Sequence, residues 1–600
     1  MILNSPSVPP ALQQVLSLLE GEERVMVRNN WSSVAPGRWS LAVDAALSEP
    51  ATEFMATRTG WRVVVSFVPG DNRVEIYPCA SSGPTVTFPH QLYNGKPEGR
   101  DPWRTGKLCL DQPGATFGRD RWTGEPSDIV EKVIWHLSRL LMWIDAAATG
   151  QLKQVGDPFE VPPSPKNLSY PVIGFDEAIS GFKSWMEMEQ RWGSVSFIDI
   201  PHGRANRVTV TFSDSGGTIV KTSSWGAWAG QAASVQMGVW LRLDMIPVVR
   251  PWGLPTTWNE LNALIAEQAF DLSEVLHFAG VQLRKRTRKN ESATLLLGFP
   301  VEERVGDEPS RLHWMAIGSV PLQHRHSKMN GFRPIEANRR ILDRAVAQSH
   351  GRLDWMRTMN WTSDQLRRRG PSSEKLGSSR IALLGAGALG GAVAENLVRM
   401  GNRDLVILDG ERLEVGNLTR HALGLEAVGR NKAVALADAL NSSMIDGRTV
   451  GHATNFPPSD ESVIACLQAA DVVVDCTGAD DVLRRMADFE WGTEKIFVSL
   501  AITWRAEGLL AYTASEVSFP YFDAVERMAS METPSPAPSE STMEGIGCWH
   551  PIFPATAEDM RLWAAFGTRF IRKAIESPSR TLSYYRQHED GQIELVATNV

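Results

Sequence analysis

The stretch of the chain with the most potential chemistry runs over residues 380–432. An apolar run, IALLG, leads into Gly385, Gly387 and Gly390, which form the pattern GxGxxG. Glycines at this spacing let the backbone turn tightly and approach a phosphate, which then lies at the N-terminus of the next helix. The apolar run reads as a buried strand and the segment after the glycines as a helix, so the context predicts a nucleotide site.

An acid and several polar residues follow the glycines. The run LVILD ends at Asp409, about 20 residues further on, where a carboxylate can accept hydrogen bonds from ribose hydroxyls. The alternative is that Asp409 only caps a turn before Gly410. Next come Asn417, Arg420 and Lys432. Cations at the phosphates suit nucleotidyl transfer, in which charge develops on the phosphates, better than hydride transfer.

A second carboxylate, Asp475, ends the apolar run VVVD. Ligands of open α/β sheets bind at the carboxyl ends of the strands. A carboxylate at that place can hold magnesium. We therefore predict Asp475 as a magnesium ligand near the phosphates.

The candidate nucleophiles are five cysteines, which are too few and too scattered for a disulfide scaffold: Cys79, Cys109, Cys466, Cys476 and Cys548. Cys548 ends a segment, residues 526–547, that is rich in Pro, Ser, Glu and Met and is predicted to be a mobile loop. A thiol there suits nucleophilic attack better than core packing. Cys109 lies in the segment TGKLCLD, and the other three cysteines are predicted to be structural.

The elements around Cys109 predict a compact α+β domain over residues 1–158. Residues 10–28 have helical spacing, and the runs WRVVVSFVP, RVEIYP and PTVTF predict antiparallel strands. Beyond Trp122, a long amphipathic helix is expected, with Ser127 as its cap. The segment TGKLCLD falls between the strands and this helix.

The rest of the chain predicts two further domains, so the fold class is a multidomain α/β and α+β protein. A proline-rich break, VPPSPKNLSYP, separates the first domain from a mixed α+β linker domain over residues 159–370, with a helix near residues 258–278. We find no chemistry in it. Residues 371–600 form the third domain, with the cysteine loop at 526–548.

The bulk composition bounds the partners. The 61 basic and 69 acidic side chains give a net charge of −8, which argues against nucleic acid. No apolar run approaches the roughly 20 residues that span a bilayer. The N-terminus lacks the pattern of a signal peptide. A cytoplasmic location without membrane attachment is expected.

The motifs of the third domain resemble the adenylation domain of ubiquitin-activating enzymes and of their bacterial ThiF and MoeB relatives. The resemblance covers about residues 375–515 and rests on GAGALGG, NLTRH, GRNKA and DCTGADD. It implies a Rossmann-like fold, ATP and magnesium, and a homodimer formed through this domain. It also implies site roles: ribose for Asp409; phosphates for Asn417, Arg420 and Lys432; magnesium and the α-phosphate for Asp475.

Two details of this resemblance concern single residues. His421 stands where the family usually has glutamine. The family also takes an arginine from the partner subunit, for which Arg339, Arg340 and Arg344 are candidates.

The first domain resembles ubiquitin-conjugating enzymes over about residues 50–145. In that family the cysteine of a segment like GKLCLD carries an acyl group as a thioester, which implies this role for Cys109. The family's His-Pro-Asn tripeptide, whose asparagine supports the oxyanion, is missing here. Either Asn94, in the segment LYNG, substitutes for it or another group assists.

The fused arrangement resembles the CD-NTase-associated protein 2 family of bacterial CBASS antiphage systems. The resemblance implies a transferase that adenylates the C-terminal carboxylate of a cGAS-like nucleotidyltransferase. The acyl group would then pass from Cys548 to Cys109 and on to a lysine of a target protein. Three alternatives stay open: a sulfur-carrier adenylyltransferase of cofactor biosynthesis, a nicotinamide oxidoreductase, and a non-catalytic nucleotide-binding scaffold.

Overall fold

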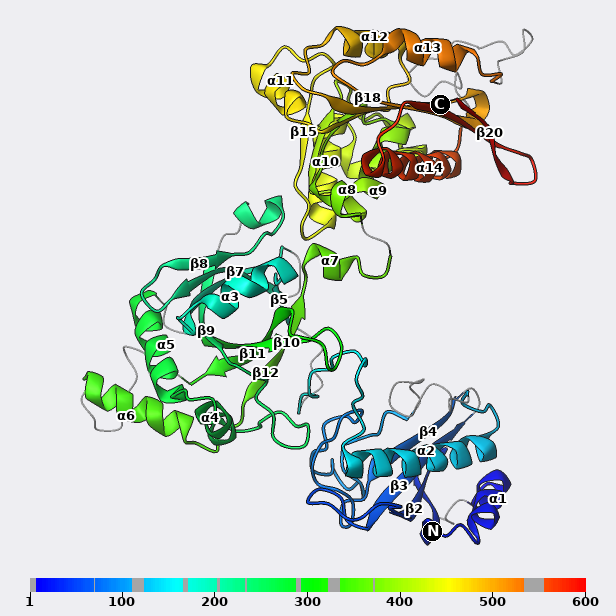
Figure 1. The fold of residues 1–600 in the computed structure, drawn as a ribbon. Helices are drawn as coiled ribbons and strands as arrows, with labels where there is room; N and C mark the ends of the chain where they lie inside the picture. The colour runs from blue at the N-terminus through cyan, green and yellow to red at the C-terminus, as the bar shows by residue number, and fades with distance from the viewer. Residues whose placement is uncertain are drawn as a thin grey trace. The chain divides into compact units, whose positions relative to one another are not determined.

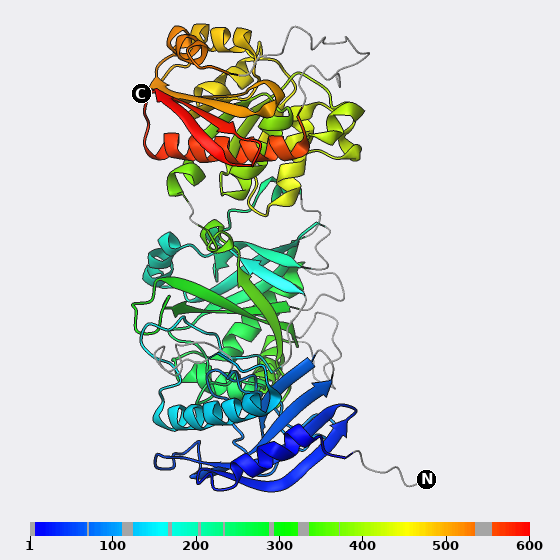
Figure 2. The same ribbon diagram turned by 90° about the vertical axis from the view of Figure 1, so that its right-hand side faces the viewer.

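The computed structural model describes most of the chain (Figures 1 and 2), over residues 7–68, 71–110, 124–165, 171–201, 206–231, 235–286, 293–321, 335–370, 373–533 and 555–599. Cys548, Trp122 and all of residues 534–554 lie outside these ranges. The chain divides into two compact units, residues 1–223 with 234–360, and residues 224–233 with 361–600.

The N-terminal part of the first unit is built on a four-stranded antiparallel sheet in the order β1-β2-β3-β4. The strands are β1 (Val25–Ala35), β2 (Arg38–Ala46), β3 (Arg58–Val68) and β4 (Asp71–Pro78), and the helices are α1 (Pro10–Leu19) and α2 (Ile129–Thr149). Figure 1 shows α2 lying across the sheet. Trp143 of α2 packs edge-on against Trp61 of β3, with ring centroids 5.9 Å apart.

Three local predictions for this part are wrong, two about its helices and one about a strand. The helix predicted over residues 10–28 ends at Leu19, because Gly21, with φ of +97°, turns the chain into a strand that starts at Val25. The cap of α2 is Asp128, whose carboxylate accepts from the Val130 and Glu131 amides, rather than Ser127.

The run PTVTF (residues 84–88) is not a strand. The side-chain amide of Asn94 donates to the carbonyls of Pro84 and Val86, at 2.8 Å each. A side chain therefore holds these carbonyls where a neighbouring strand was expected.

The second part of the first unit is an eight-stranded sheet in the order β5-β12-β11-β10-β9-β6-β7-β8. Because β5 pairs with both β12 and β7, seven of these strands close into a ring. The strands are β5 (Val172–Phe175), β6 (Trp192–Asp199), β7 (Arg207–Asp214), β8 (Ile219–Thr222), β9 (Val235–Arg242), β10 (Ala293–Val301), β11 (Arg311–Val320) and β12 (Asp354–Asn360).

Helices cover both faces of this sheet. Trp185 of α3 (Phe182–Glu187) packs with Trp240 and Trp314 in one core cluster, and the other face packs against the remaining helices. These are α4 (Trp258–Ala266), α5 (Leu272–Arg286) and α6 (Glu336–Ala347). The single helix predicted near residues 258–278 is therefore two helices.

The second unit contains an eight-stranded sheet in the order β15-β14-β13-β16-β17-β18-β19-β20. The first five strands are parallel and the last three join by antiparallel pairing. The strands are β13 (Arg380–Leu384), β14 (Asp404–Leu408), β15 (Thr449–His452), β16 (Val472–Asp475), β17 (Lys495–Ile502), β18 (Gly508–Glu516), β19 (Thr581–Gln587) and β20 (Ile593–Asn599).

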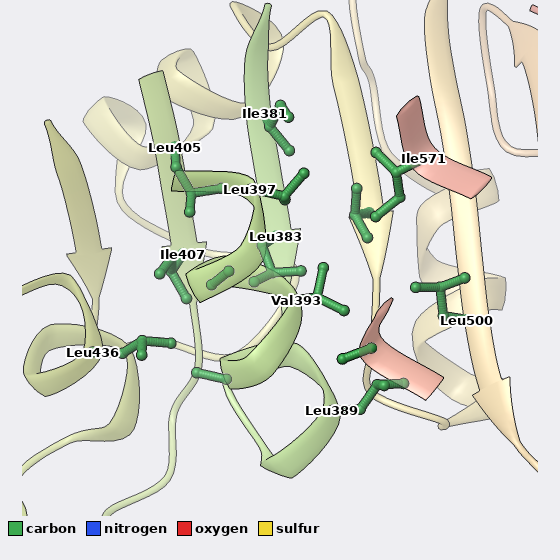
Figure 3. Packing of buried hydrophobic residues seen from close by; sticks show 14 of the residues in the cluster. Ile381, Leu383, Leu389, Val393, Leu397, Leu405, Ile407, Leu436, Leu500 and Ile571 are labelled. Carbon is green, nitrogen blue, oxygen red and sulfur yellow. The ribbon is translucent and has the colours of Figure 1, made fainter. Parts of the chain in front are cut away.

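Two helices, α9 (Ala388–Arg399) and α14 (Ala557–Glu576), pack on one face of this sheet. Figure 3 shows Leu389, Val393 and Leu397 of α9 beside the apolar side chains of β13. The other face packs with α12 (Asp480–Asp488) and α13 (Tyr521–Ala529), beside α11 (Glu461–Gln468). Since α13 runs to Ala529, the start of the predicted cysteine loop at residue 526 is helical.

The second unit also includes a short segment from earlier in the chain. The amides of Gly226 and Ala227 donate to the carbonyls of Ile445 and Gly447, at 2.8 and 2.9 Å. The indole of Trp228 donates to the Ile445 carbonyl at 2.9 Å. These bonds fasten the segment just after α10 (Lys432–Ser443). Among the described residues, no helix is long and apolar enough to cross a membrane.

Candidate nucleotide site and cysteine segment

The candidate nucleotide site lies where three parallel strands end side by side. Leu384 of β13 pairs with Leu408 of β14 on one side and with Asp475 of β16 on the other. The glycine loop, Asp409 and Asp475 therefore meet at the carboxyl edge of the sheet. This is the edge at which open α/β sheets bind their ligands.

The three positions of the loop are occupied by glycine for different structural reasons. A Cβ on Gly390 would lie 2.0 Å from the carbonyl oxygen of Gly385, so helix α9 requires glycine there to approach the loop. Gly385 has φ of +90°, a conformation that favours glycine. At Gly387, the cap position of α9, a Cβ would meet nothing within 4 Å. That open space lies at the helix N-terminus, where a phosphate is expected.

The carboxylate of Asp409 is held by two backbone amides. Ala386 of the glycine loop donates to Oδ2 at 2.7 Å, and Glu411 donates to Oδ1 at 2.8 Å. The second bond is the turn cap that the sequence left open as an alternative. Each oxygen keeps a further lone pair, so the cap and a ribose contact are compatible.

His421 completes a network around the same loop. Its Nε2 lies 2.6 Å from the Ala386 carbonyl oxygen, and its Nδ1 accepts from the Leu423 amide at 3.1 Å. These partners require the neutral ring protonated on Nε2. Burial lowers the pKa of His421 and the charge of Lys432 lowers it further, against the bond to Ala386 and the charge of Asp409. The backbone of Ala386 is thus held at its amide by Asp409 and at its carbonyl by His421.

The predicted phosphate ligands lie on the segment that follows. The Asn417 side chain accepts from the Glu414 amide within its own turn, at 3.0 Å. Arg420 ends that turn and is half-buried. Lys432, at the start of α10, is 7% exposed and pairs with the carboxylate of Glu411. The structure therefore brings Lys432, His421 and Asp409 to the loop, with Asn417 and Arg420 on the adjoining turn.

Asp475 is 1% exposed, and its carboxylate is fixed by neighbours. Thr477 donates to Oδ1 through its amide at 3.0 Å and its hydroxyl at 2.6 Å, and Ser499 donates to Oδ2 at 3.0 Å. Burial raises the pKa of Asp475 despite these bonds. Cys476, the next residue, has its pKa raised well above the ordinary value by burial, as suits an inert thiol.

Cys109 lies in an irregular segment of the N-terminal part and is half-buried. Its amide donates to the carbonyl of His90 at 3.0 Å. Asn94, the predicted substitute for the oxyanion asparagine, is 3% exposed, and both of its amide hydrogens are taken by Pro84 and Val86. Its Oδ1 accepts from Arg104 at 3.1 Å. Asn94 therefore holds the segment together and has no hydrogen left for an oxyanion.

Two residues here escaped the sequence prediction. His90 is the cross-strand neighbour of Cys109, and no local pattern in the sequence connects the two residues. Cys79, predicted to be structural, is half-buried. Burial raises its pKa, but hydrogen bonds from Ser81 and Ser82 outweigh burial and bring the pKa to about 7. A thiol with this pKa is half ionised at neutral pH.

The candidate arginines for a partner subunit lie on α6, in the first unit. Arg339 pairs with Glu336 on the same helix, and Arg340 pairs with Glu274 of α5 at 2.6 Å. Both pairs are within the linker domain, so these contacts do not select one of the arginines.

Comparison with known proteins identifies the family. Residues 150–361 match the Cap2 central linker domain, and residues 362–502 match the ThiF family. The ATP-dependent ubiquitin transferase-like protein Cap2 of Enterobacter hormaechei subsp. hoffmannii (strain UCI 50) is 40% identical over 98% of this chain and 98% of its own length. The chain belongs to the Cap2 family. The resemblance of the fused arrangement to the CD-NTase-associated protein 2 family is confirmed, and so is the ThiF-type adenylation domain.

Other similarities are shorter. The Cap2 of Escherichia coli (strain TW11681) is 33% identical over 24% of this chain and 25% of its own. The maize adenylyltransferase and sulfurtransferase MOCS3-2 is 36% identical over 17% of this chain and 21% of its own. Among solved structures, E. coli MccB with MccA-N7isoASN covers 37% of this chain and 65% of its own at 14% identity, with a TM-score of 0.27.

Proposed function

We propose that this protein uses ATP to activate the C-terminal carboxylate of a partner protein and then joins that carboxyl group to an amine. The observation that carries the proposal is the meeting of the glycine loop, Asp409 and Asp475 at the carboxyl edge of the parallel sheet, with Lys432 beside them. Its occurrence in a chain of the Cap2 family supports a transferase over a nicotinamide oxidoreductase.

In the activation step, a carboxylate oxygen of the partner attacks the α-phosphorus of ATP. The new phosphorus–oxygen bond forms as the bond to pyrophosphate breaks, and the products are an acyl-adenylate and pyrophosphate. Asp409 holds the ribose, and Asn417, Arg420 and Lys432 hold the phosphates. Lys432 exchanges its pairing with Glu411 for phosphate oxygens, which stabilises the charge on the leaving group.

Asp475 is the proposed magnesium ligand. Magnesium usually takes one or two protein carboxylates together with substrate phosphates, so a single acid beside the phosphate loop fits it. Thr477 and Ser499 fix the carboxylate and leave it lone pairs. When bound, magnesium neutralises phosphate charge.

Two cysteines carry the acyl group after activation. The Cys548 thiolate attacks the acyl-adenylate carbonyl and AMP leaves; the Cys109 thiolate then attacks the thioester and Cys548 leaves. A lysine amine of a target finally displaces Cys109 and forms an amide. Each thioester keeps the acyl group activated and bound to the chain. The proposed domains of this relay are residues 1–158, ubiquitin-conjugating-like; 159–370, the linker; and 371–600, the adenylation domain, whose sequence includes Cys548.

The proposed acyl donor is a cGAS-like nucleotidyltransferase in antiphage defence, and the proposed assembly is a homodimer through the adenylation domain. Both come from the family resemblance. Mass spectrometry of proteins trapped on Cys109→Ser identifies the donor, because serine holds the acyl group as a stable ester. A donor of another class would replace this part of the proposal and leave the chemistry unchanged.

The test is ATP–pyrophosphate exchange that depends on an added cGAS-like nucleotidyltransferase. Cys548→Ala should retain exchange and lose both thioesters, and Cys109→Ala should retain the first thioester and lose the conjugate. Cys466→Ala is the matched control, because Cys466 is an exposed thiol outside the relay. Conjugation that survives both Cys548→Ala and Cys109→Ala would refute the relay.

The same assay separates the alternatives. A sulfur-carrier adenylyltransferase would show exchange but no dependence of its product on Cys109. A non-catalytic scaffold would bind ATP and show no exchange.

A further inference from the structure

The segment around Cys109 sets one histidine directly opposite the cysteine. The Leu92 amide donates to the Lys107 carbonyl at 2.9 Å, and the Cys109 amide donates to the His90 carbonyl at 3.0 Å. These two bonds flank the antiparallel bridge between Gln91 and Leu108. In this register, His90 is the cross-strand neighbour of Cys109, and such neighbours carry their Cβ atoms about 5 Å apart.

Burial shows which residues share a face. Gln91 and Leu108 are each 4% exposed and Leu110 is 2% exposed, so this set points into the domain. Gln91 is fixed there by its bonds to the Gly106 carbonyl and the Phe88 amide, at 3.0 Å each. Since side chains alternate along extended chain, Cys109 lies on the opposite face, and its cross-strand neighbour is His90.

The His90 ring is buried without satisfying its polar atoms. The side chain is 9% exposed, and Nε2 is buried with no hydrogen-bond partner among the described residues. Nδ1 lies 3.6 Å from a carboxylate oxygen of Glu160, which is an ion-pair distance. Unpaired buried nitrogens are rare in folded proteins and call for an explanation.

The backbone of His90 is strained as well. Its φ of +55° lies in the left-handed region, which few residues other than glycine adopt. Strain of this kind persists only where the surroundings impose it, and it gathers at functional sites. The strain and the unpaired nitrogen are two separate observations on one residue, and that residue is the cross-strand neighbour of the proposed acyl carrier.

Resting on the proposed function, we propose that His90 is the general base for the last step at Cys109, with Glu160 as the residue that orients it. The lysine amine attacks the thioester carbonyl, and the proton leaving the amine nitrogen moves to His90 Nε2. The carbon–sulfur bond then breaks, and the Cys109 thiolate takes the proton back from the ring. Glu160 stabilises the imidazolium that exists between these two transfers.

This assignment explains why the family tripeptide is dispensable. The amide of Asn94 is fully engaged, so an asparagine does not serve the thioester here. An imidazole with an unpaired ring nitrogen can move a proton, a function that an asparagine cannot perform.

The charged groups around His90 bear on its pH dependence. Glu160 is the acid closest to the ring. Burial lowers the pKa of Lys153, and the charges of Glu302 and Glu160 oppose this, so Lys153 belongs to the same group of charges. Lys107, two residues before Cys109, pairs with Glu75 at 3.5 Å. The charged group that lies closest to the ring is thus the carboxylate of Glu160.

The experiment uses the full chain, loaded at Cys109 with ATP, magnesium and a cGAS-like nucleotidyltransferase. After EDTA stops activation, the decay of the thioester onto free lysine is followed from pH 5 to pH 9. His90→Gln should load normally and discharge about 10²-fold more slowly, the usual contribution of a general base. The wild-type rate should rise with pH, as expected for a reaction assisted by a general base, and His90→Gln should lose that rise.

Two further variants sharpen the test. Glu160→Gln should load normally and slow the discharge, because the imidazolium formed during the reaction loses its counter-charge. Free imidazole should partly restore His90→Ala. His588→Gln is the matched control, since His588 forms a histidine–glutamate pair with Glu594 at 2.9 Å in the other unit.

The outcomes separate the two proposals. If the Cys109 thioester of His90→Gln discharges at the wild-type rate and with the wild-type pH profile, the role of His90 is overturned and the relay stays intact. Absence of any Cys109 thioester in the wild type contradicts the relay.

Iodoacetamide alkylation of Cys109 tests the histidine without an acyl donor. It is measured in a Cys79→Ser background, because the Cys79 thiol competes at neutral pH. As a general base, His90 should assist loss of the thiol proton from Cys109, so His90→Gln should slow alkylation at a fixed pH. An unchanged alkylation rate counts against the proposal.

Discussion

The nucleotide site and the cysteine segment are built in opposite ways. At the nucleotide site, parallel strands place the glycine loop, Asp409 and Asp475, and the hydrogen-bonding groups of Asp409, His421 and Asp475 that face the loop have described partners. At the cysteine segment, irregular chain is held by the side chains of Asn94 and Gln91, and one buried ring nitrogen is unpaired. The first site is preorganised by backbone; the second keeps a strained residue with an unpaired nitrogen as the cross-strand neighbour of Cys109, the proposed nucleophile.

The largest effect is expected where the backbone-built site is most deeply buried. Asp475→Ala should abolish ATP–pyrophosphate exchange, with a loss of at least about 10²-fold, because the phosphates lose their metal ligand. The control is Asp480→Ala, an exposed acid on α12. Exchange that persists in Asp475→Ala would show that the metal assignment is wrong.

The glycine loop offers a matched pair of substitutions. Gly390→Ala should destabilise the adenylation domain by about 1–3 kcal/mol, because its Cβ would overlap the Gly385 carbonyl. Gly387→Ala should leave the melting temperature unchanged and raise the KM for ATP, because its Cβ enters the open space expected for a phosphate. Thermal unfolding and exchange kinetics separate the two. Equal effects of both substitutions on KM and stability would remove the distinction between packing and ligand approach.

The side-chain-built segment should fail in a different way. Asn94→Ala removes three hydrogen bonds and leaves the Pro84 and Val86 carbonyls unpaired, which should cost about 2–4 kcal/mol. Exchange should stay at the wild-type level, because activation takes place in the other unit. Hydrogen exchange of residues 84–109 measures the local loss. Loss of ATP–pyrophosphate exchange would show that the two sites are coupled.

The smallest effect is expected at His421. His421→Gln restores the usual residue of the adenylation family and keeps a donor for the Ala386 carbonyl, so the KM for ATP should change by less than about 3-fold. The wild type and His421→Gln should differ in stability at low pH. Because the folded pKa of His421 is lowered, the unfolded chain binds a proton that the folded chain does not, and stability is lost as pH falls below about 6.5.

Thermal melts of both proteins at pH 7.5 and pH 5.5 measure this loss. His421→Gln should lose less stability than the wild type over the interval. An equal loss in both would show that His421 does not carry the pH dependence.

The sequence by itself predicted the candidate nucleotide site, because the backbone geometry of the strands and of the glycine loop dictates which residue types can form it. Gly385 and Gly390 are glycines for reasons of φ and contact, and Asp409 and Asp475 end short, fully apolar runs of the kind typical of buried parallel strands. The local pattern therefore predicted parallel strands, and the carboxyl ends of parallel strands meet at one edge of the sheet. The role of each residue toward ATP stays a prediction.

Only the tertiary structure decided the surroundings of Cys109. The strand predicted at residues 84–88 is absent because Asn94, distant by several residues, takes its carbonyls. The pairing of His90 with Cys109, and of His90 with Glu160 beyond helix α2, joins residues that no local period relates. Side-chain bonds between irregular segments leave no repeating pattern in the sequence, so burial and register had to be observed before the histidine could be connected with the thiol.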